Sequence, residues 1–176
     1  MNVVLIGYRG CGKTTVGRLL ASRLGWPFVD TDTLIEEGTG ATIRELFSDG
    51  AEQAFRDLES EVVTEVARRD HQVISTGGGV VLRESNTRAL KRNGRLVWFT
   101  APADVLWQRI LNDKSRLVNR PAVDKAGGLR IVEDALAVRE PLYARSADVI
   151  IDTRGRSPAE LADDIMATVR ISGIRT

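Results

Sequence analysis

A glycine-rich loop near the start of the chain limits the possible folds more than any other segment. Residues 2–6 read NVVLI, an apolar run typical of a buried strand, and residues 7–15 read GYRGCGKTT, which fits the pattern GxxxxGK[ST]. Apolar side chains at helical spacing then occupy residues 16–24, and Gly25 ends that pattern. A strand, such a loop and a helix in succession are the context in which backbone N–H groups enclose a phosphate, so the sequence predicts a phosphate-binding site.

The residue types inside this loop suit phosphate chemistry. Gly10 and Gly12 leave room for the backbone to wrap around a phosphate. Lys13 is placed to reach the β- and γ-phosphates of a nucleotide, and the hydroxyl of Thr14 is placed to bind Mg²⁺. Cys11 occupies a position that needs a small side chain, and we interpret its thiol as a space-filling group rather than a nucleophile.

Short apolar runs alternate with helical patterns along the rest of the chain. Besides residues 2–6, strands are expected at 27–29, 73–75, 95–99 and 149–151. Apolar spacing, capping boxes and proline positions predict helices at 14–24, 42–47, 55–69, 84–93, 102–111, 132–143 and from 158 onward. This alternation predicts an α/β fold of three layers, a five-stranded parallel sheet with helices on both faces, and ligands at the carboxyl ends of the strands.

Residues 113–128 interrupt the alternation. They are charged, include Pro121 and end in a pair of glycines, so we expect a mobile loop or lid there. No linker, repeat or low-complexity segment divides the chain, and its 176 residues are enough for one compact domain and short for two. The sequence therefore predicts a single domain over residues 1–176 with a lid at about 113–128.

The charge balance and the rare residues exclude several functions. Lys+Arg number 25 and Asp+Glu 24, and a net charge of +1 is unlike a protein that coats nucleic acid or an anionic membrane. Four of the basic residues are lysines, so 21 are arginines, the better partner for carboxylates and phosphates. A single cysteine and a single histidine, His71, leave no Cys/His zinc site and no intramolecular disulfide, and we expect His71 in an exposed loop.

Membrane insertion and secretion are not expected either. The chain has no run of about 18 uncharged apolar residues, and its first residues fit a strand better than a signal peptide. We therefore expect a soluble, cytoplasmic, monomeric protein with no nucleic acid and no membrane as a partner.

Two carboxylates follow the second expected strand. Asp30 and Asp32 are two residues apart, and residues at that spacing in a strand share one face, so both side chains could face the phosphates. One carboxylate would then hold Mg²⁺ through water, and the other would accept a hydrogen bond from a hydroxyl group. The alternative is that one of them only caps the next helix, and for Asp30 this is a serious competitor.

A run of glycines follows the third expected strand. Gly77, Gly78 and Gly79 would let a ligand approach the backbone closely and present N–H donors, although alone the run would be read as a flexible turn. Several arginines occur on helices or loops near the strand ends, where a solvated surface is the alternative for most of them. They are Arg56, Arg109, Arg120, Arg139, Arg145 and Arg156.

Together these segments resemble one family. GYRGCGKTTVGRLLA, FVDTD, FRDLE, STGGGVV, NRP and REPLY occur in the order and spacing of shikimate kinases, over about residues 1–158. The resemblance implies transfer of the γ-phosphate of ATP to the 3-hydroxyl of shikimate, on the route to chorismate and the aromatic amino acids. It also implies the P-loop kinase fold, a small domain like the nucleoside-monophosphate kinases, with a five-stranded parallel sheet and a closing lid.

The resemblance assigns residues to the nucleotide. It implies that Lys13 and Arg120 act on the transferring phosphate, and that Thr14 binds Mg²⁺ with Asp30 in the outer shell of the ion. It implies an ATP-binding set made of Gly10, Cys11, Gly12, Lys13, Thr14, Thr15, Arg109, Arg120, Pro121 and Arg156, of which Arg109, Pro121 and Arg156 would surround the adenine.

The resemblance also assigns residues to the acceptor. Asp32 would engage the shikimate hydroxyls, either as a base or only by orienting the reacting hydroxyl. Arg56 and Arg139 would bind the shikimate carboxylate, with the glycine run Gly77, Gly78 and Gly79 beside them. Glu59, one helical turn from Arg56, would orient that arginine.

The lid departs from the family pattern. A compact DKxRPL is replaced by DKSRLVNRP over residues 113–121, so either Arg116 or Arg120 could reach the phosphate; we favour Arg120 because Pro121 follows it. Two other functions share the phosphate loop: a small kinase for gluconate or a nucleoside monophosphate, and a non-catalytic ATP-binding module. The FRDLE, STGGGVV and REPLY segments favour shikimate over the first, and the combination of Lys13, Thr14, Asp32 and Arg120 argues against the second.

Overall fold

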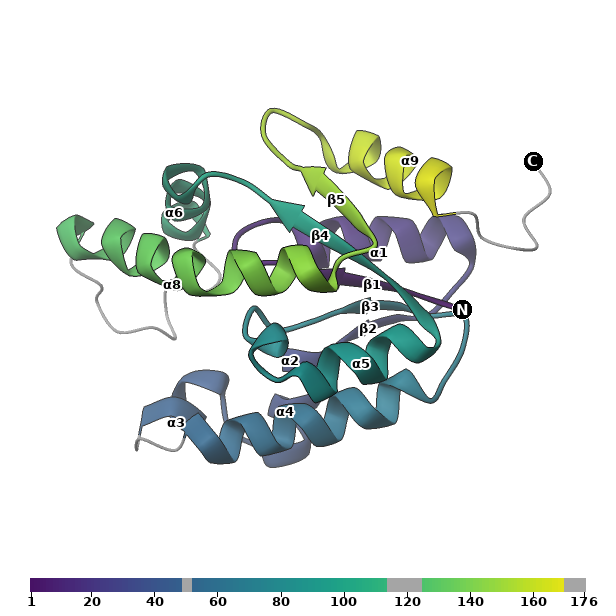
Figure 1. The fold of residues 1–176 in the computed structure, drawn as a ribbon, viewed down its shortest axis with the longest axis horizontal. Helices are drawn as coiled ribbons and strands as arrows, with labels where there is room; N and C mark the ends of the chain where they lie inside the picture. Colours follow the sequence, from purple (N-terminus) through teal and green to yellow (C-terminus); the bar gives the residue numbers. More distant parts are fainter. Residues whose placement is uncertain (49–51, 114–124, 170–176) are drawn as a thin grey trace.

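Five parallel strands form one sheet in the part of the chain that the structure, a computed structural model, describes: residues 1–48, 52–113 and 125–169. Their order in the sheet is β2-β3-β1-β4-β5 (Figure 1). Each strand expected from the sequence is confirmed, with ends that differ by one residue at most. The strands are β1 (Asn2–Ile6), β2 (Phe28–Asp30), β3 (Val73–Ser75), β4 (Gly94–Thr100) and β5 (Val149–Asp152).

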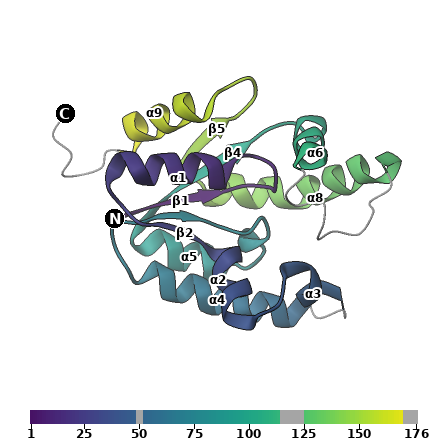
Figure 2. The same ribbon diagram turned by 180° about the vertical axis from the view of Figure 1, so that it is seen from behind.

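Helices cover both faces of this sheet, which confirms the three-layer prediction. Figure 1 shows α5 and α8 in front of the sheet, and Figure 2 shows α1 on the opposite face. The helices are α1 (Lys13–Leu24), α2 (Thr31–Thr39), α3 (Ile43–Ser48), α4 (Glu52–Ala67), α5 (Glu84–Arg92), α6 (Ala103–Asn112), α8 (Lys125–Ser146) and α9 (Pro158–Thr168), with a 3₁₀ turn η1 at Val80–Leu82. Within the described ranges, no helix has the length and apolarity needed to cross a membrane.

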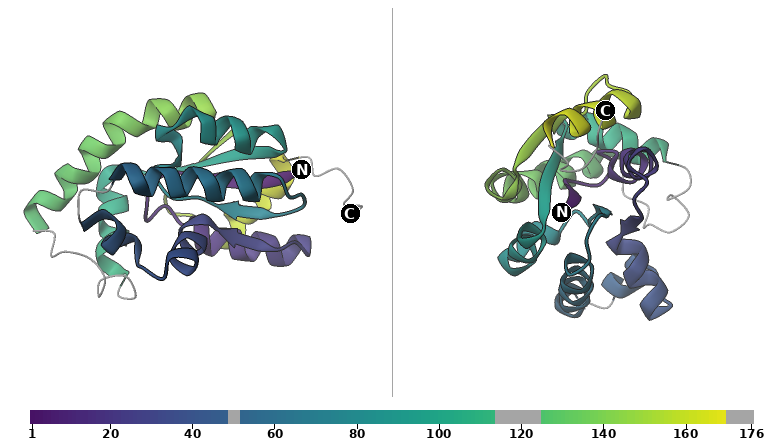
Figure 3. Two further views of the ribbon diagram at one scale, coloured as in Figure 1. Left: turned by 90° about the horizontal axis from the view of Figure 1, so that it is seen from below. Right: turned by 90° about the vertical axis from the view of Figure 1, so that its right-hand side faces the viewer.

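The central strand divides the core into two clusters. Val3 and Leu5 of β1 point into a cluster with side chains of α1, α6 and α9, whereas Val4 and Ile6 point into a cluster with α4, α5 and η1. The long helix α8 contributes to both clusters, and it extends past the sheet beside α6 (Figure 3). Because β1 is buried at every residue, its carboxyl end fixes the glycine-rich loop at the middle of the sheet.

One helix is missing from the sequence-based expectation. α2 starts at Thr31, so β2 ends at Asp30 and Asp32 lies in the first turn of a helix. The expectation that Asp30 and Asp32 share one face of a strand is therefore wrong. The side chain of Asp30 accepts a hydrogen bond from the backbone N–H of Asp32 at 3.2 Å, and this capping bond starts the helix where the sequence pattern favours continued strand.

The predicted lid ends earlier than expected. Residues 114–124 lie outside the described residues, but α8 begins at Lys125, so residues 125–128 are helical and the loop expected there is wrong. The glycine pair that suggested a loop lies in this helix, and the packing of α8 against α6 explains the glycine at position 128. A Cβ on Gly128 would lie 2.2 Å from the ring of Trp107 on α6, so glycine allows the two helices to approach closely.

The burial pattern predicts a large difference between two isoleucines on strands. Ile74 of β3 is fully buried, so we expect Ile74→Ala to lower the free energy of unfolding by about 2–5 kcal/mol through lost apolar burial and a cavity. Ile150 of β5 is the matched control, because it is 56% exposed. Urea unfolding followed by circular dichroism measures both variants, and equal losses would contradict this core.

Candidate active site

The glycine-rich loop wraps around the ammonium group of its own lysine. Gly7 has a φ of +137°, and a Cβ at that position would lie 2.5 Å from the carbonyl oxygen of Phe99. Lys13 is buried, and its Nζ donates hydrogen bonds to the carbonyl oxygens of Gly7 at 2.7 Å and Tyr8 at 3.0 Å. The side chain of Cys11 fills space beneath the loop and is also buried, as the space-filling interpretation requires. The loop therefore concentrates positive charge at the N-terminus of α1.

A carboxylate and a hydroxyl meet beside this loop. The hydroxyl of Thr14 donates a hydrogen bond to Asp30 Oδ2 at 3.1 Å, and the other oxygen of Asp30 accepts the capping bond from the N–H of Asp32. Asp30 thus caps α2 and also faces the phosphate loop. Two hard oxygen donors at this distance are the kind of group that Mg²⁺ prefers.

The glycine run brings two acidic side chains close together. A Cβ on Gly77 would lie 2.5 Å from Asp32 Oδ1 and 3.0 Å from Glu59 Oε1, so both carboxylates rest against the bare backbone. The N–H of Gly77 donates a hydrogen bond to the hydroxyl of Thr31 at 3.2 Å, which ties the start of α2 to the end of β3. Asp32 therefore lies at the glycine run, and it comes from a helix rather than from the expected strand end.

A buried ion pair lies at the far end of the same run. Arg56 Nη1 contacts Glu59 Oε2 at 2.8 Å, and the guanidinium group packs on Gly79, where a Cβ would lie 2.2 Å from Nη1. The rings of Phe55 and Phe47 lie 5.1 and 5.6 Å from the guanidinium carbon of Arg56. The predicted contact of Glu59 with Arg56 is thus present.

Burial dominates the electrostatics of this pair. The side chain of Glu59 is 1% exposed, and its Oε1 has no hydrogen-bond partner among the described residues. Loss of water raises the pKa of the Glu59 carboxyl, while the charges of Arg56, Arg139 and Arg83 oppose that rise.

The second predicted carboxylate-binding arginine reaches the middle of the run. Arg139 Nη1 donates a hydrogen bond to the carbonyl oxygen of Gly78 at 3.3 Å, and its guanidinium carbon lies 5.5 Å from the centre of the Tyr8 ring. The hydroxyl of Tyr143 donates to the same carbonyl oxygen. Arg56 and Arg139 therefore lie along one glycine run and beside the phosphate loop.

Only some of the residues predicted to surround the adenine lie in the described part of the chain. Arg109 of α6 donates two hydrogen bonds, each 2.8 Å long, to the hydroxyl and carbonyl oxygens of Thr153, directly after β5. Arg156 contacts Asp164 on α9 at 2.7 Å. These two arginines hold the connection between β5 and α9. Arg116, Arg120 and Pro121 lie outside the described residues, whereas Arg145 is described and exposed.

Several residues that the sequence analysis did not select complete the site. Arg83 donates to the carbonyl oxygen of Arg56 at 2.8 Å and contacts Asp57 at 2.7 Å, and it thereby fixes α4 against the glycine run. Arg9 places its guanidinium carbon 5.7 Å from the centre of the Tyr8 ring. Position in the loop was the only signal for Tyr8 and Arg9, and no spacing pattern points to Arg83.

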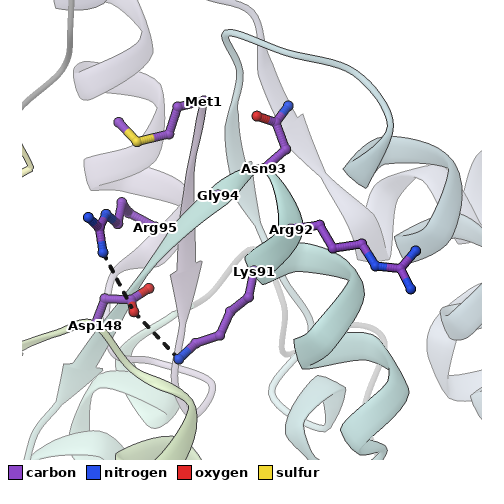
Figure 4. A pocket seen from close by; sticks show the side chains of 7 residues that line it. All are labelled: Met1, Lys91, Arg92, Asn93, Gly94, Arg95 and Asp148. Carbon is purple, nitrogen blue, oxygen red and sulfur yellow. Dashed lines mark ion pairs between the residues drawn. The ribbon is translucent and has the colours of Figure 1, made fainter.

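A second concavity lies at the opposite end of the sheet. It has a volume of about 250 Å³ and is bordered by Met1, Asn93 and several basic residues (Figure 4). Lys91 and Arg95 both face Asp148, at 3.4 and 4.0 Å, and Arg92 points away from them. These cations are a solvated ion-pair cluster rather than a ligand cage. His71 is exposed in a loop, as expected.

The order of the strands, the loop after β1 and the buried lysine at the start of α1 define a P-loop kinase fold. Comparison with known proteins identifies the family within this class of fold. The family model described as "Shikimate kinase" matches residues 9–170, and the chain belongs to the shikimate kinase family.

Its relatives cover nearly the full chain. A shikimate kinase of Symbiobacterium thermophilum is 43% identical over 99% of each sequence, and one of Thermodesulfovibrio yellowstonii is 42% identical over 94% of this chain and 92% of its own. The solved shikimate kinase from Acinetobacter baumannii in complex with shikimate has a TM-score of 0.88 at 36% identity, and covers 99% of this chain and 95% of its own. A Sinorhizobium meliloti gluconokinase at 16% identity and a TM-score of 0.56 shares the fold alone.

The raised pKa of Glu59 predicts a particular pH dependence of stability. The folded protein keeps the Glu59 proton to a higher pH than the unfolded chain, so stability from this group is lost as pH rises above the ordinary value of 4.5. We expect Glu59→Gln to gain stability relative to wild type as pH rises above about 4.5, because the glutamine cannot lose a proton. Urea unfolding at a series of pH values measures the difference; a relative loss over that range would mean that the Arg56 charge outweighs burial.

Proposed function

We propose that this chain transfers the γ-phosphate of ATP to the 3-hydroxyl of shikimate, giving shikimate 3-phosphate and ADP. The observation that carries the proposal is the juxtaposition of a phosphate loop with two arginines on one glycine run. Arg56 and Arg139 lie against Gly79 and Gly78, and the loop that holds Lys13 follows the neighbouring strand β1. An acceptor with a carboxylate and hydroxyl groups fits that arrangement, since arginine binds carboxylates through paired N–H donors.

The nucleotide side uses the loop and its lysine. Backbone N–H groups of residues 10–15 would bind the phosphates, and Lys13 would exchange the carbonyl oxygens of Gly7 and Tyr8 for the β- and γ-phosphates. Arg109 and Arg156 would border the adenine, since both fix the chain between β5 and α9. Arg120 and Pro121 are proposed to join them from the lid at 113–124.

Mg²⁺ is the proposed cofactor. Thr14 and Asp30 would hold it, the hydroxyl directly and the carboxylate through water, because their oxygens already face each other at 3.1 Å. Within the described ranges, no group of three or more His, Cys, Asp or Glu side chains is arranged to hold a metal ion. When bound, the ion neutralises charge on the phosphates.

The acceptor side orients one hydroxyl group. The shikimate carboxylate would lie between Arg56 and Arg139, and Glu59 would keep the Arg56 guanidinium in place. Asp32, at the other end of the run beside Gly77, would then accept a hydrogen bond from the reacting hydroxyl. Phosphoryl transfer needs mainly positioning and charge neutralisation, so Asp32 acts through orientation at least as much as through its basicity.

Charge neutralisation and exclusion of water complete the proposed mechanism. Lys13 and, from the lid, Arg120 would stabilise negative charge on the transferring phosphoryl group. Closure of the lid would keep water from competing with the hydroxyl acceptor. We propose that the chain works as one domain over residues 1–176, as a monomer in the cytoplasm, with no nucleic acid or membrane partner.

A panel of acceptors tests the proposed reaction. In a coupled assay of ADP release, we expect turnover with shikimate and little with quinate, gluconate or nucleoside monophosphates. Two arginines on one glycine run match a carboxylate, which separates shikimate from the nucleotides. Quinate and gluconate also carry a carboxylate, so they test the position of the reacting hydroxyl relative to Asp32. Turnover with only a nucleotide acceptor would overturn the proposal, and ATP binding without turnover of any acceptor would indicate a non-catalytic module.

The position of Asp32 predicts a selective loss of turnover. We expect Asp32→Asn to lower kcat by about 10²–10⁴-fold, because the reacting hydroxyl loses its acceptor. ATP affinity should stay nearly unchanged, since Lys13 and the loop bind the phosphates. Steady-state kinetics and ATP titration measure both quantities, with Asp163→Asn as the control at an exposed ion pair with Arg23. Turnover like that of wild type would remove Asp32 from the reaction.

A further inference from the structure

A buried tyrosine hydroxyl bonds to the middle of the glycine run. Tyr143 of α8 is 0% exposed, and its ring stacks on Trp98 of β4 with 5.7 Å between the ring centres. Its hydroxyl donates a hydrogen bond to the carbonyl oxygen of Gly78. Burial raises the pKa of this hydroxyl above its usual value, so the group stays protonated and remains a donor.

The same carbonyl oxygen accepts a bond from an arginine of the proposed site. Arg139 Nη1 lies 3.3 Å from it, which is long for an N–H···O bond. Arg139 and Tyr143 are four residues apart on α8, so they lie on one face of the helix and reach the same atom. A carbonyl oxygen has two lone pairs, and these two donors occupy both.

Gly78 also lies against the phosphate loop. A Cβ on Gly78 would lie 3.5 Å from the carbonyl oxygen of Gly7 and 3.5 Å from the backbone nitrogen of Arg9, so the phosphate loop packs directly against this residue. The Gly78 peptide is therefore held between the phosphate loop and α8.

We propose that Tyr143 is a positioning residue that allows Arg139 to exchange the Gly78 carbonyl for the substrate carboxylate. A carbonyl oxygen that loses its only protein donor becomes less stable, but here the tyrosine hydroxyl remains bonded to the partly buried Gly78 carbonyl when the arginine leaves. The guanidinium group can then turn to a ligand while the Tyr8 ring still supports it. This inference rests on the proposed function, since it needs an acceptor with a carboxylate.

Removal of one oxygen atom tests the inference. Tyr143→Phe keeps the ring stacked on Trp98 and deletes only the hydroxyl. We expect the Kd and KM for shikimate to rise about 10-fold, because Arg139 becomes the sole donor to the Gly78 carbonyl oxygen and must give up that bond to reach the carboxylate. The Kd for ATP should stay unchanged, and kcat at saturating shikimate should remain near that of wild type. Calorimetric titration and steady-state kinetics give these values.

A double mutant separates positioning from a general structural effect. If Tyr143 acts through Arg139, adding Tyr143→Phe to Arg139→Ala should weaken shikimate binding no further. Trp98→Phe is the matched control, since it perturbs the same stack without touching the Gly78 carbonyl, and its shikimate Kd should stay like that of wild type.

The possible failures have different signatures. An unchanged shikimate Kd in Tyr143→Phe, an equal rise in the ATP Kd, or additive losses in the double mutant would each overturn the role of Tyr143. A wild-type chain that neither binds nor phosphorylates shikimate would overturn the proposed function itself. The two failures are distinguished because the second is visible before any variant is made.

Discussion

Three consecutive residues without Cβ atoms set the spacing of the whole site. Gly77 lets the carboxylates of Asp32 and Glu59 rest on the backbone, and a Cβ at Gly79 would overlap the guanidinium group of Arg56. Gly78 between them packs against the phosphate loop. A side chain at Gly77 or Gly79 would overlap these charged groups and force them to move. The distance between the acceptor groups and the phosphate loop therefore depends on this bare stretch of backbone.

The charges gathered around this stretch compensate one another. Glu59 is buried beside Arg56, and the fields of Arg139 and Arg83 further favour its ionised form. A buried pair of this kind adds little net stability, but loss of one partner leaves the other charge unpaired, so the geometry is held strictly. The net charge of +1 conceals this cluster, because most arginines in the described part of the chain are exposed and only a few face the site.

Sequence patterns located the elements well where local signals agree with the fold. Strand bounds followed from buried apolar runs, and the final helix begins at the capping box of Ser157 and Glu160, as expected. Local reasoning failed at two points, one a helix cap that it had weighed only as the alternative and the other a contact between two helices. Asp30 ends β2 because its side chain caps α2, and the glycines of the expected loop become the start of α8 because Gly128 packs on Trp107. Neither contact has a periodic signature.

The sequence alone determined the fold class, the phosphate loop and the types of residue that face phosphate and carboxylate groups. The fold class and the phosphate loop follow from spacing within short segments, since strand and helix periodicity and loop motifs are local properties. The residues assigned to the carboxylate follow instead from the resemblance to shikimate kinases. Only the tertiary structure decided how those segments meet: that β3 lies between β2 and β1, and that Arg83 and Tyr143 hold Arg56 and Gly78 from other elements. The residues joined by these two bonds lie 27 and 65 positions apart in the sequence. Contacts over such separations depend on packing that no local pattern encodes.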